Sequence, residues 1–238
     1  MLAEIVRIHR ESRRTYGSPR IHAELKDKGH RCGRHRVARL MRENGIEAKM
    51  TSRFIANPGR HEFYEGTGNQ LLGRGPVSTL NEVWVGDFTY IKTQQSWIYL
   101  ATVMDLYSRR IIGWSVSTRR TSNLTKDSVQ MAIEQRRSKP GTLFHSDQGI
   151  EYAAHSFRAL LDSYGIQRSM SRQGNCYDNA YAESFFHSLK TEMVYFRRFK
   201  SAAEAVAHIM DYISFYNTKR RHSSLGYQSP VDYEKLAA

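Results

Sequence analysis

Three apolar runs, spaced as in successive β-hairpins, constrain the fold of this chain more than any other feature. They read VWVGDFTYI, SWIYLATVMDLYS and RIIGWSVS, and they begin at Val83, Ser96 and Arg110. The first run is β-branched and aromatic on both faces, which is typical of a strand that is covered on both sides. The chain from Val83 onward is therefore predicted to be built around a β-sheet.

The segments after these runs alternate between helical and extended patterns. NLTKDSVQMAIEQRR is a predicted helix, GTLFHSDQG a short strand that runs into a glycine turn, SFRALLDSYG a helix, and IQRSMS another strand. Two more helices follow, and Ser201 and Glu204 form a capping box at the start of the second. The order β-β-β-α-β-α-β-α-α predicts an α/β fold with a mixed five-stranded sheet and flanking helices.

The first fifty residues show a different pattern, that of three short helices. The first spans residues 2–12, and the second has Ser18 as a candidate cap with Pro19 at its first helical position. The third runs from about Gly33 to Asn44. Three short helices of this kind suit a helix-turn-helix module over residues 1–50, whose last helix enters the major groove.

The third helix carries four arginines away from its apolar side, and these are the candidate DNA contacts: Arg34, Arg36, Arg39 and Arg42. The net charge of +13 favours a polyanionic partner, with nucleic acid as the first candidate. Residues 1–80 hold 16 Lys and Arg against 8 Asp and Glu, and residues 81–238 hold 20 against 15. Most of the excess therefore precedes the sheet, as in a DNA-binding arm. A helical bundle with a solvated basic face is the alternative.

Residues 51–80 lack clear periodicity and contain five glycines and two prolines, so we predict a linker between the module and a core over residues 81–238. The chain contains no run of about 18 apolar residues, which a membrane span requires. The first residues lack the apolar segment of a secretory signal, and the two cysteines form no disulfide framework. We expect a soluble protein of a reducing compartment, without membrane contact.

Three acids occupy positions at which a carboxylate is unusual. Asp87 lies inside the first predicted strand, Asp147 ends the strand TLFHSD, and Glu183 interrupts an otherwise apolar and aromatic helix. A buried carboxylate is costly unless it is paired or binds a metal, and α/β sheets place their chemistry at strand ends. Taken singly, each could be an ordinary turn, cap or helix-face residue. The 35 residues between the second and third acids nevertheless allow a return to the same sheet edge.

Three carboxylates at one sheet edge would form a site of hard oxygen ligands. Mg²⁺ suits such a site, and two ions bridged by carboxylates can support phosphoryl transfer. Two nearby residues are alternatives for a functional role. Asp105 precedes a predicted hairpin loop, where Asp commonly forms the turn, and we favour that role. His145 could touch a substrate or be a hydrogen-bonded structural residue.

Lys190 follows Glu183 by seven residues in the same predicted helix. At about 100° per residue, it returns to within about 20° of Glu183, two turns further along. An apolar seam beside this pair is predicted to face the core and consists of Ala182, Phe186, Leu189 and Met193. Lys190 could therefore hold a DNA phosphate while Glu183 holds the metal, and a solvated lysine is the alternative. Asp178 and Asn179 are expected to cap or orient the start of this helix.

Four blocks of the sequence resemble the DDE transposase and retroviral integrase superfamily, and most closely the second-frame protein (OrfB) of bacterial two-frame insertion sequences. The blocks are WVGDFTYI, LFHSDQGIEYA, SMSRQGNCYDNAYAESFFHSLKTE and YNTKRRHSSLGYQSPVDYE, in this order, and the resemblance extends over nearly the whole chain. The resemblance implies a ribonuclease-H-like integrase core, Mg²⁺ or Mn²⁺ as cofactor, and Asp87, Asp147 and Glu183 as catalytic acids. It also implies a basic residue at the spacing of Lys190.

The function that this resemblance implies is transposition, by metal-dependent DNA strand cleavage and strand transfer at the ends of a bacterial insertion sequence. Two ends must be brought together, so a homo-oligomer on DNA is expected. An upstream-frame partner (OrfA), bound or fused, and a location at the nucleoid in the bacterial cytoplasm are also expected. The alternatives are a non-catalytic DNA-binding regulator derived from a transposase and a structure-directed nuclease.

Overall fold

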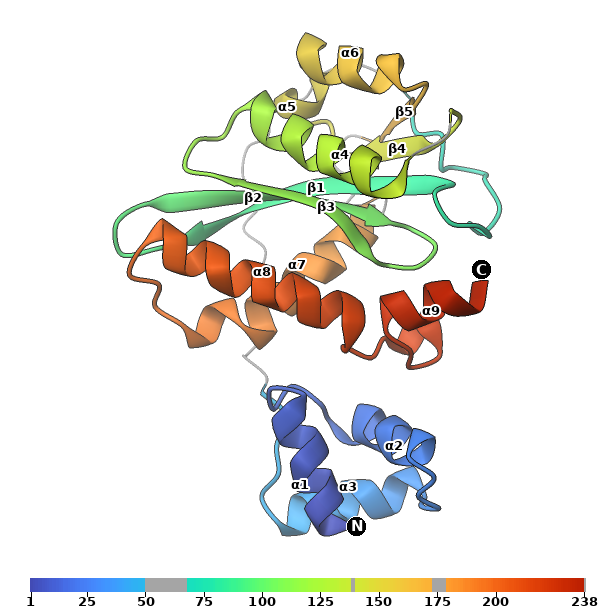
Figure 1. Ribbon diagram of the computed structural model, residues 1–238, viewed down its shortest axis with the longest axis vertical. Coiled ribbons are helices and arrows are strands. Elements are labelled where there is room, and N and C mark those ends of the chain that lie inside the picture. Colours follow the sequence, from blue (N-terminus) through green and yellow to red (C-terminus); the bar gives the residue numbers. More distant parts are fainter. Residues whose placement is uncertain (50–67, 138–139, 173–178, 238) are drawn as a thin grey trace.

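A five-stranded mixed sheet lies at the centre of the larger part of the chain in the computed structural model (Figure 1). The structure describes residues 1–49, 68–137, 140–172 and 179–237. The strands are β1 (Val83–Lys92), β2 (Trp97–Asp105), β3 (Ile111–Ser117), β4 (Leu143–Ser146) and β5 (Gln167–Met170). Their order is β3-β2-β1-β4-β5, in which the pairs β1–β2 and β2–β3 are antiparallel and the pairs β1–β4 and β4–β5 are parallel. The predicted mixed sheet with flanking helices is confirmed.

Helices cover both faces of this sheet (Figure 1). One face carries α4 (Ser122–Arg136), α5 (Ile150–Ala153) and α6 (His155–Ser163). The other face carries α7 (Ala180–Glu192) and α8 (Ala202–Thr218), and α9 (Pro230–Ala237) follows α8. Two single-turn 3₁₀ helices, η2 (Val194–Phe196) and η3 (Ser223–Leu225), flank α8.

The two faces of β1 belong to two different apolar clusters. Trp84 packs in a cluster with Phe157 of α6, whereas Val85 packs in a cluster with Phe185 of α7. Successive residues of a strand point to opposite faces of the sheet. Asp87, two residues after Val85, therefore lies on the face that α7 covers.

Three short helices form the N-terminal module: α1 (Leu2–Glu11), α2 (Ser18–Asp27) and α3 (Arg34–Glu43). Their buried apolar residues pack together and are Ile5, Ile8, Ile21, Leu25, Val37 and Met41. The prediction that Ser18 caps the second helix is wrong, because Ser18 is already helical and Gly17 is the residue before it. Pro19 has a backbone angle suited to the first turn, which begins here without a side-chain cap.

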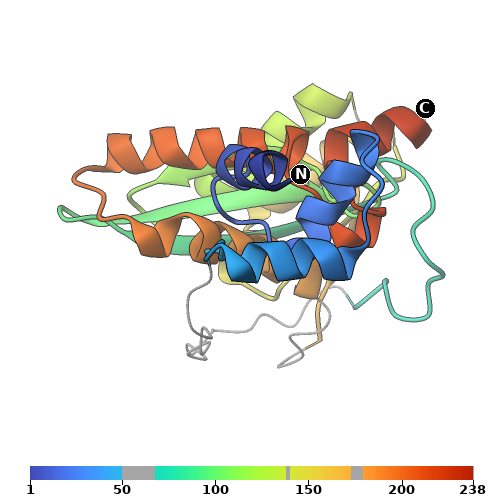
Figure 2. The same cartoon turned by 90° about the horizontal axis from the view of Figure 1, so that it is seen from below.

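Tyr16 and Arg221 join this module to the segment that follows α8. The Tyr16 hydroxyl accepts a hydrogen bond from the backbone N–H of Arg221 (2.7 Å) and donates one to the carbonyl of Lys219 (3.0 Å). The Arg221 guanidinium donates to the carboxylates of Glu24 (2.7 Å) and Asp27 (2.6 Å) in α2. In the view from below, the module lies in front of α7 and α8 (Figure 2). We call this set of contacts the Arg221 clamp.

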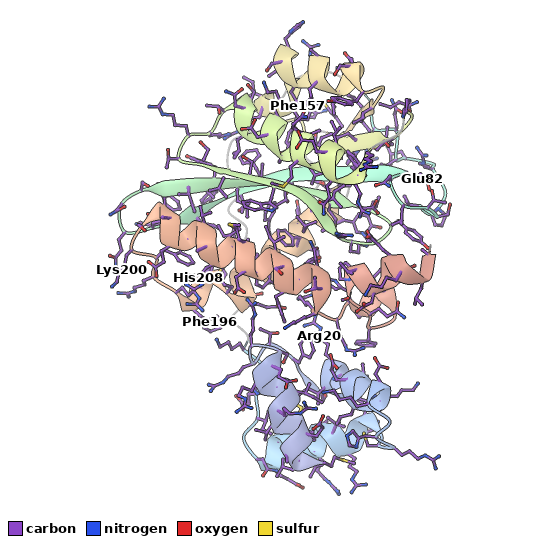
Figure 3. All side chains as sticks on the ribbon, viewed as in Figure 1. Arg20, Glu82, Phe157, Phe196, Lys200 and His208 are labelled. Carbon is purple, nitrogen blue, oxygen red and sulfur yellow. The ribbon has the colours of Figure 1, made fainter. Side chains whose placement is uncertain are left out.

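A second contact joins the module to α7. Arg20 lies at the junction of module and core (Figure 3) and approaches the carboxylate of Glu192 in α7 (3.6 Å). The same carboxylate accepts hydrogen bonds from the Arg220 guanidinium (2.6 Å) and the Tyr212 hydroxyl (2.8 Å). The helix that carries Glu183 is therefore held from the module and from α8 together.

Part of the predicted linker over residues 51–80 lies outside the described residues. Residues 68–80 are described and lead to β1 without forming a helix or strand of their own. In the described part of the chain, no helix combines the length and the apolar character that crossing a membrane requires.

Candidate active site

The register between β1 and β4 brings Asp87 and Asp147 together. These strands run parallel, with Val85 of β1 opposite His145 of β4. Continuing the same offset by two residues places Asp147, just after the end of β4, beside Asp87. The two acids therefore share the edge of the sheet at which β4 ends, where α/β folds commonly place their functional groups.

Glu183 reaches this edge from the first turn of α7. The predicted apolar seam of α7 is confirmed, because Ala182, Phe186, Leu189 and Met193 are all buried. Phe185, which was not predicted, is buried with them. This apolar side fixes the helix against the sheet, and Glu183 on another side is exposed.

Asn179 attaches the start of α7 to the strand that carries Asp87. It precedes the helix, but its side chain makes no capping hydrogen bond, so the expected cap is not formed by this residue. Its amide donates instead to the carbonyl of Gly86 (3.5 Å). Asp178, the other expected cap, lies outside the described residues. Asn179 orients α7 relative to β1 at the residue next to Asp87.

The three carboxylates interact electrostatically. Burial raises the pKa of Asp87 well above its usual range, and the negative charges of Asp147 and Glu183 raise it further. The backbone N–H of Phe88, which donates to Asp87 (2.8 Å), and the Lys190 ammonium act in the opposite direction. Burial and Asp147 also raise the pKa of Glu183. Acids that oppose each other's ionisation at a sheet edge are typical of functional sites.

The loop after β4 holds the Asp147 side chain in place. The Asp147 carboxylate accepts a hydrogen bond from the backbone N–H of Gly149 (3.0 Å). A Cβ atom at Gly149 would lie 3.0 Å from that carboxylate and 3.3 Å from the carboxylate of Glu151. A side chain at this position would press on both carboxylates, and the glycine leaves them room beside the loop backbone.

An ion pair between Arg120 and Glu151 lies beside Asp147, and it was not predicted. Glu151 is buried in α5 and pairs through both of its oxygens with the Arg120 guanidinium, one contact being 3.2 Å. The hydrogen bond with Glu151 and the charge of Asp147 raise the pKa of Arg120. Glu151 stands inside the block LFHSDQGIEYA, but no local pattern identifies its partner 31 residues earlier.

Lys190 lies two helical turns beyond Glu183 and beside Asp87. Burial lowers the pKa of Lys190, whereas the Asp87 carboxylate raises it. Its Nζ atom lies 5.3 Å from the centre of the Tyr90 ring. Lys190 is therefore a half-buried residue beside the carboxylates and not a solvated lysine of the helix surface.

Asp105, the alternative acid, forms the turn between β2 and β3. It is fully buried, and its carboxylate accepts hydrogen bonds from the backbone N–H groups of Asn81 (2.7 Å), Tyr107 (3.0 Å) and Ser108 (3.0 Å). A carboxylate that accepts hydrogen bonds from three backbone N–H groups stabilises the conformation of the turn. The turn role favoured from the sequence agrees with this geometry.

His145 is engaged through both ring nitrogens. Nδ1 lies 2.8 Å from the hydroxyl of Ser169, Nε2 lies 3.1 Å from the hydroxyl of Ser171, and the residue is fully buried. These bonds join β4 to β5 and the residues after it. The geometry supports the structural role and not contact with a substrate.

The carboxylate oxygens of the three acids suit a hard divalent cation, although the three side chains do not all approach one point. Asp87, Asp147 and Glu183 offer only carboxylate oxygens, and a cation among them would relieve their mutual repulsion. Within the ranges that the structure describes, no three His, Cys, Asp or Glu side chains stand close enough to bind one ion jointly.

The arginines of α3 form a separate surface. Arg34, Arg36, Arg39 and Arg42 are all exposed, and Arg39 also approaches Glu43 (3.7 Å). Val37 and Met41 on the other side of the helix are buried. The module thus presents a basic helix face to solvent.

Comparisons with known proteins identify both parts of the chain. Residues 1–54 match a family model described as an HTH-like domain, and residues 78–176 and 164–230 match two models described as an integrase core domain. The chain is 39% identical over 240 residues to the insertion element IS600 uncharacterized 31 kDa protein of Shigella sonnei, covering 99% of this chain and 88% of that protein. It is 38% identical over 239 residues to the transposase for insertion sequence element IS904 of Lactococcus lactis subsp. lactis, covering 98% and 92%.

Two further comparisons agree. The transposase InsF for insertion sequence IS3A of Escherichia coli K12 is 39% identical over 224 residues, covering 94% of this chain and 78% of that protein. A chain in the cryo-EM structure of a simian T-cell lymphotropic virus intasome in complex with PP2A regulatory subunit B56 gamma has a similar fold. Its TM-score is 0.55 at 18% identity, covering 96% of this chain and 73% of that chain. By its ribonuclease-H-like core, its HTH-like module and its relatives along the whole length, the chain belongs to the transposases of bacterial insertion sequences.

Proposed function

We propose that this chain cleaves DNA strands at the ends of an insertion sequence and joins them to a target, with Asp87, Asp147 and Glu183 as its catalytic acids. The observation that carries the proposal is the β1–β4 register, which places two of these acids side by side. The pKa of Asp87, raised by burial and by both other acids, supports a shared site.

Each of the three acids would contribute carboxylate oxygens to one or two Mg²⁺ or Mn²⁺ ions. When bound, such ions favour the attack of a water or hydroxyl on phosphorus and stabilise the leaving oxygen. The protein positions the acids through fixed elements, because Asp147 is held by the Gly149 N–H and Glu183 by the buried side of α7. Pairing with Glu151 holds the Arg120 guanidinium in place near Asp147.

The reaction on DNA consists of two phosphoryl transfers at the same acids. A water oxygen first attacks the phosphorus at the element end, the bond from phosphorus to the 3′ oxygen breaks, and a 3′-hydroxyl is released. That hydroxyl then attacks a phosphodiester of the target, whose own 3′ oxygen leaves. Lys190 would hold a phosphate of the element end beside Asp87, because its ammonium interacts electrostatically with the Asp87 carboxylate.

We assign DNA reading to residues 1–50, with Arg34, Arg36, Arg39 and Arg42 as contacts, and catalysis to residues 81–238, with residues 51–80 as a linker. Residues 78–230 match integrase core models, which supports the catalytic assignment. Because two ends react together, the active form would be a homo-oligomer on DNA. An upstream-frame partner would add further DNA binding.

The proposal is tested with Asp87→Asn on DNA carrying element ends in the presence of Mg²⁺. Nicking and joining should fall at least about 10³-fold, on the scale seen when a group of a catalytic unit is removed. Binding of the same DNA should be retained. Asp162→Asn, at an exposed acid of α6, is the matched control and should stay active. A wild-type chain that binds ends but neither nicks nor joins them would instead support the regulator.

The assignment of DNA reading has its own test. Arg36→Ala and Arg42→Ala should each make the salt dependence of binding shallower, by about 0.9 in log–log slope for each DNA phosphate that the arginine neutralises. Arg7→Ala removes an exposed arginine that pairs within α1 and serves as the control. If the salt dependence of binding has the same slope in all variants, α3 does not contact DNA.

A further inference from the structure

The far half of the β1–β2 hairpin carries exposed aromatic side chains. Tyr90 is 54% exposed, Trp97 46% and Tyr195, which follows α7, 42%. The rings of Tyr90 and Trp97 meet edge to face, with centres 5.3 Å apart and planes at 75°. Burial raises the pKa of Tyr195, and the nearby Tyr90 raises it further. We call these three residues the hairpin patch.

A lysine lies beside each of the two rings Tyr90 and Trp97. The Nζ atom of Lys190 lies 5.3 Å from the centre of Tyr90, and that of Lys92 lies 5.7 Å from the centre of Trp97. Lys92 also stands directly opposite Trp97 in the strand register. Exposed rings interleaved with cations are the combination that single-stranded nucleic acids bind, through base stacking and phosphate contacts.

The hairpin patch is continuous with the catalytic acids. Phe88, the residue after Asp87, lies under the Arg120 guanidinium at 4.8 Å, and Arg120 pairs with Glu151 beside Asp147. Lys190 borders Asp87 on one side and Tyr90 on the other. A strand whose phosphodiester lies at the acids would therefore meet the patch as it leaves them.

The hairpin is fixed in place although it projects beyond the rest of the sheet (Figure 1). The backbone N–H of Gln94 at its tip donates to the carbonyl of Phe199 (2.9 Å), in the segment before α8. Rings on such an anchored hairpin lose little conformational freedom when a ligand stacks on them.

We propose that the hairpin patch binds an unpaired DNA base next to the reacting phosphodiester, stacked on Trp97 and Tyr90, with Lys92 and Lys190 on the flanking phosphates. This inference rests on the proposed function, since it takes the DNA strand at the acids as its ligand. A second copy of the chain is the competing occupant. A net charge of +13 and the lysines at both ends of the patch favour the polyanion over such a copy.

Unpaired DNA should be preferred, because a base within a duplex does not offer its face. The full chain with Asp87→Asn is titrated with a short oligothymidylate, with a blunt duplex, and with the same duplex carrying an unpaired tail. Trp97 is one of three tryptophans, and Trp84 is fully buried. Tryptophan fluorescence should therefore be quenched by the oligothymidylate and by the tailed duplex, and much less by the blunt duplex.

Trp97→Ala should abolish this quenching and weaken binding of the tailed duplex about 5- to 100-fold, the range for loss of one stacked base. Trp97→Phe, which can still stack, should recover most of the affinity, and Tyr164→Ala, at an exposed ring of the α6 end, should have no effect. Trp97 is exposed, so unchanged thermal unfolding is expected for its variants.

Three results would overturn the inference: unchanged affinity of Trp97→Ala for the tailed duplex, equal losses of affinity for tailed and blunt duplexes, or a change of oligomeric state in place of the binding defect. The last would assign the patch to contact between copies. Absence of nicking in the wild type, with the quenching intact, would remove the proposed function alone. Normal joining without a preference for unpaired DNA would remove this inference alone.

Discussion

At Asp87, the role that we propose conflicts with the stability of the fold. Its pKa is raised by burial and by two neighbouring acids, so the folded protein resists its ionisation. An acid whose pKa rises on folding makes the folded state less stable once pH exceeds the pKa of the unfolded chain. The charge at Asp87 therefore destabilises the fold at neutral pH.

Asp87→Asn should accordingly raise the midpoint of thermal unfolding at neutral pH, by about 2 to 4 °C for each kcal/mol gained. Below the ordinary carboxyl pKa of 3.8, the two proteins should unfold alike. The difference should grow as pH rises from there toward the raised folded value. Calorimetry between pH 3 and pH 8 without divalent cations checks this. A lower midpoint for Asp87→Asn at neutral pH would contradict the prediction.

Substitutions of Lys190 test the positive charge beside Asp87. Lys190→Ala should lower element-end binding and strand joining together, because it removes the ammonium that we propose holds a phosphate, and thermal stability should change little. Lys190→Arg should recover part of both, since charge matters more than shape at a phosphate. The readout is end binding and joining at low and physiological salt, with Lys235→Ala at the exposed α9 as control. Wild-type joining by Lys190→Ala would show a residue without a role in DNA contact.

The sequence could identify a functional residue only where that residue differs in polarity from its neighbours or ends a predicted element. Asp87 and Glu183 stood out because apolar neighbours surround them, and Asp147 because it ends a strand before glycine. Arg120 and Glu151 gave no such signal, because their pairing is set by how α5 meets the loop after β3. Likewise, nothing in the local sequence separates a buried, doubly bonded His145 from a catalytic one.

At the scale of single elements, α8 offers a test of how far a local signal determines a helix. The Ser201 hydroxyl accepts a hydrogen bond from the Glu204 N–H (3.2 Å) and so caps the helix as predicted. The Glu204 carboxylate departs from the predicted box, because it accepts from the N–H of Lys200 (2.6 Å), the residue before the cap. Ser201→Ala should cost about 1 kcal/mol, or about 2 to 4 °C in the unfolding midpoint.

Ser163→Ala, whose hydroxyl donates only to the carbonyl of Leu160 near the end of α6, is the matched control and should change the midpoint much less. Equal effects of the two substitutions would show that the α8 cap is not a source of stability.

Element types and faces were predictable because apolar spacing is a local property. The seam of α7 was foreseen at four positions, and Phe185 was missed because it lies beyond the seam yet still meets α8, where its ring stacks edge to face on Tyr216 (4.8 Å). The cap of α2 was misplaced by one residue, since Gly17, Ser18 and Pro19 all carry helix-start signals. When adjacent residues carry helix-start signals of equal strength, the sequence does not determine at which of them the helix begins.

At the scale of the whole molecule, the position of the module on the core could not be foreseen. The Arg221 clamp joins residues 194 to 205 positions apart, and no pattern within either segment indicates the other. Arg221→Ala should leave the carboxylates of Glu24 and Asp27 without this partner and loosen α2 from the core. Hydrogen exchange in α2 should become faster and the unfolding midpoint should fall by several degrees, whereas Arg7→Ala should change neither. Unaltered exchange in Arg221→Ala would show that other contacts suffice to dock the module.

The clamp has a consequence for where DNA is cut. With the proposed DNA-reading helix α3 and the proposed catalytic acids held in one body, the distance between the sequence that is read and the bond that is broken would be a fixed dimension of the protein. An insertion sequence using this enzyme would be excised at a constant offset from its recognised terminus, whatever bases fill the interval. Arg221→Ala, which loosens the module from the core, would make that offset variable. Mapping nick positions at single-nucleotide resolution would reveal the change as a spread of adjacent cuts.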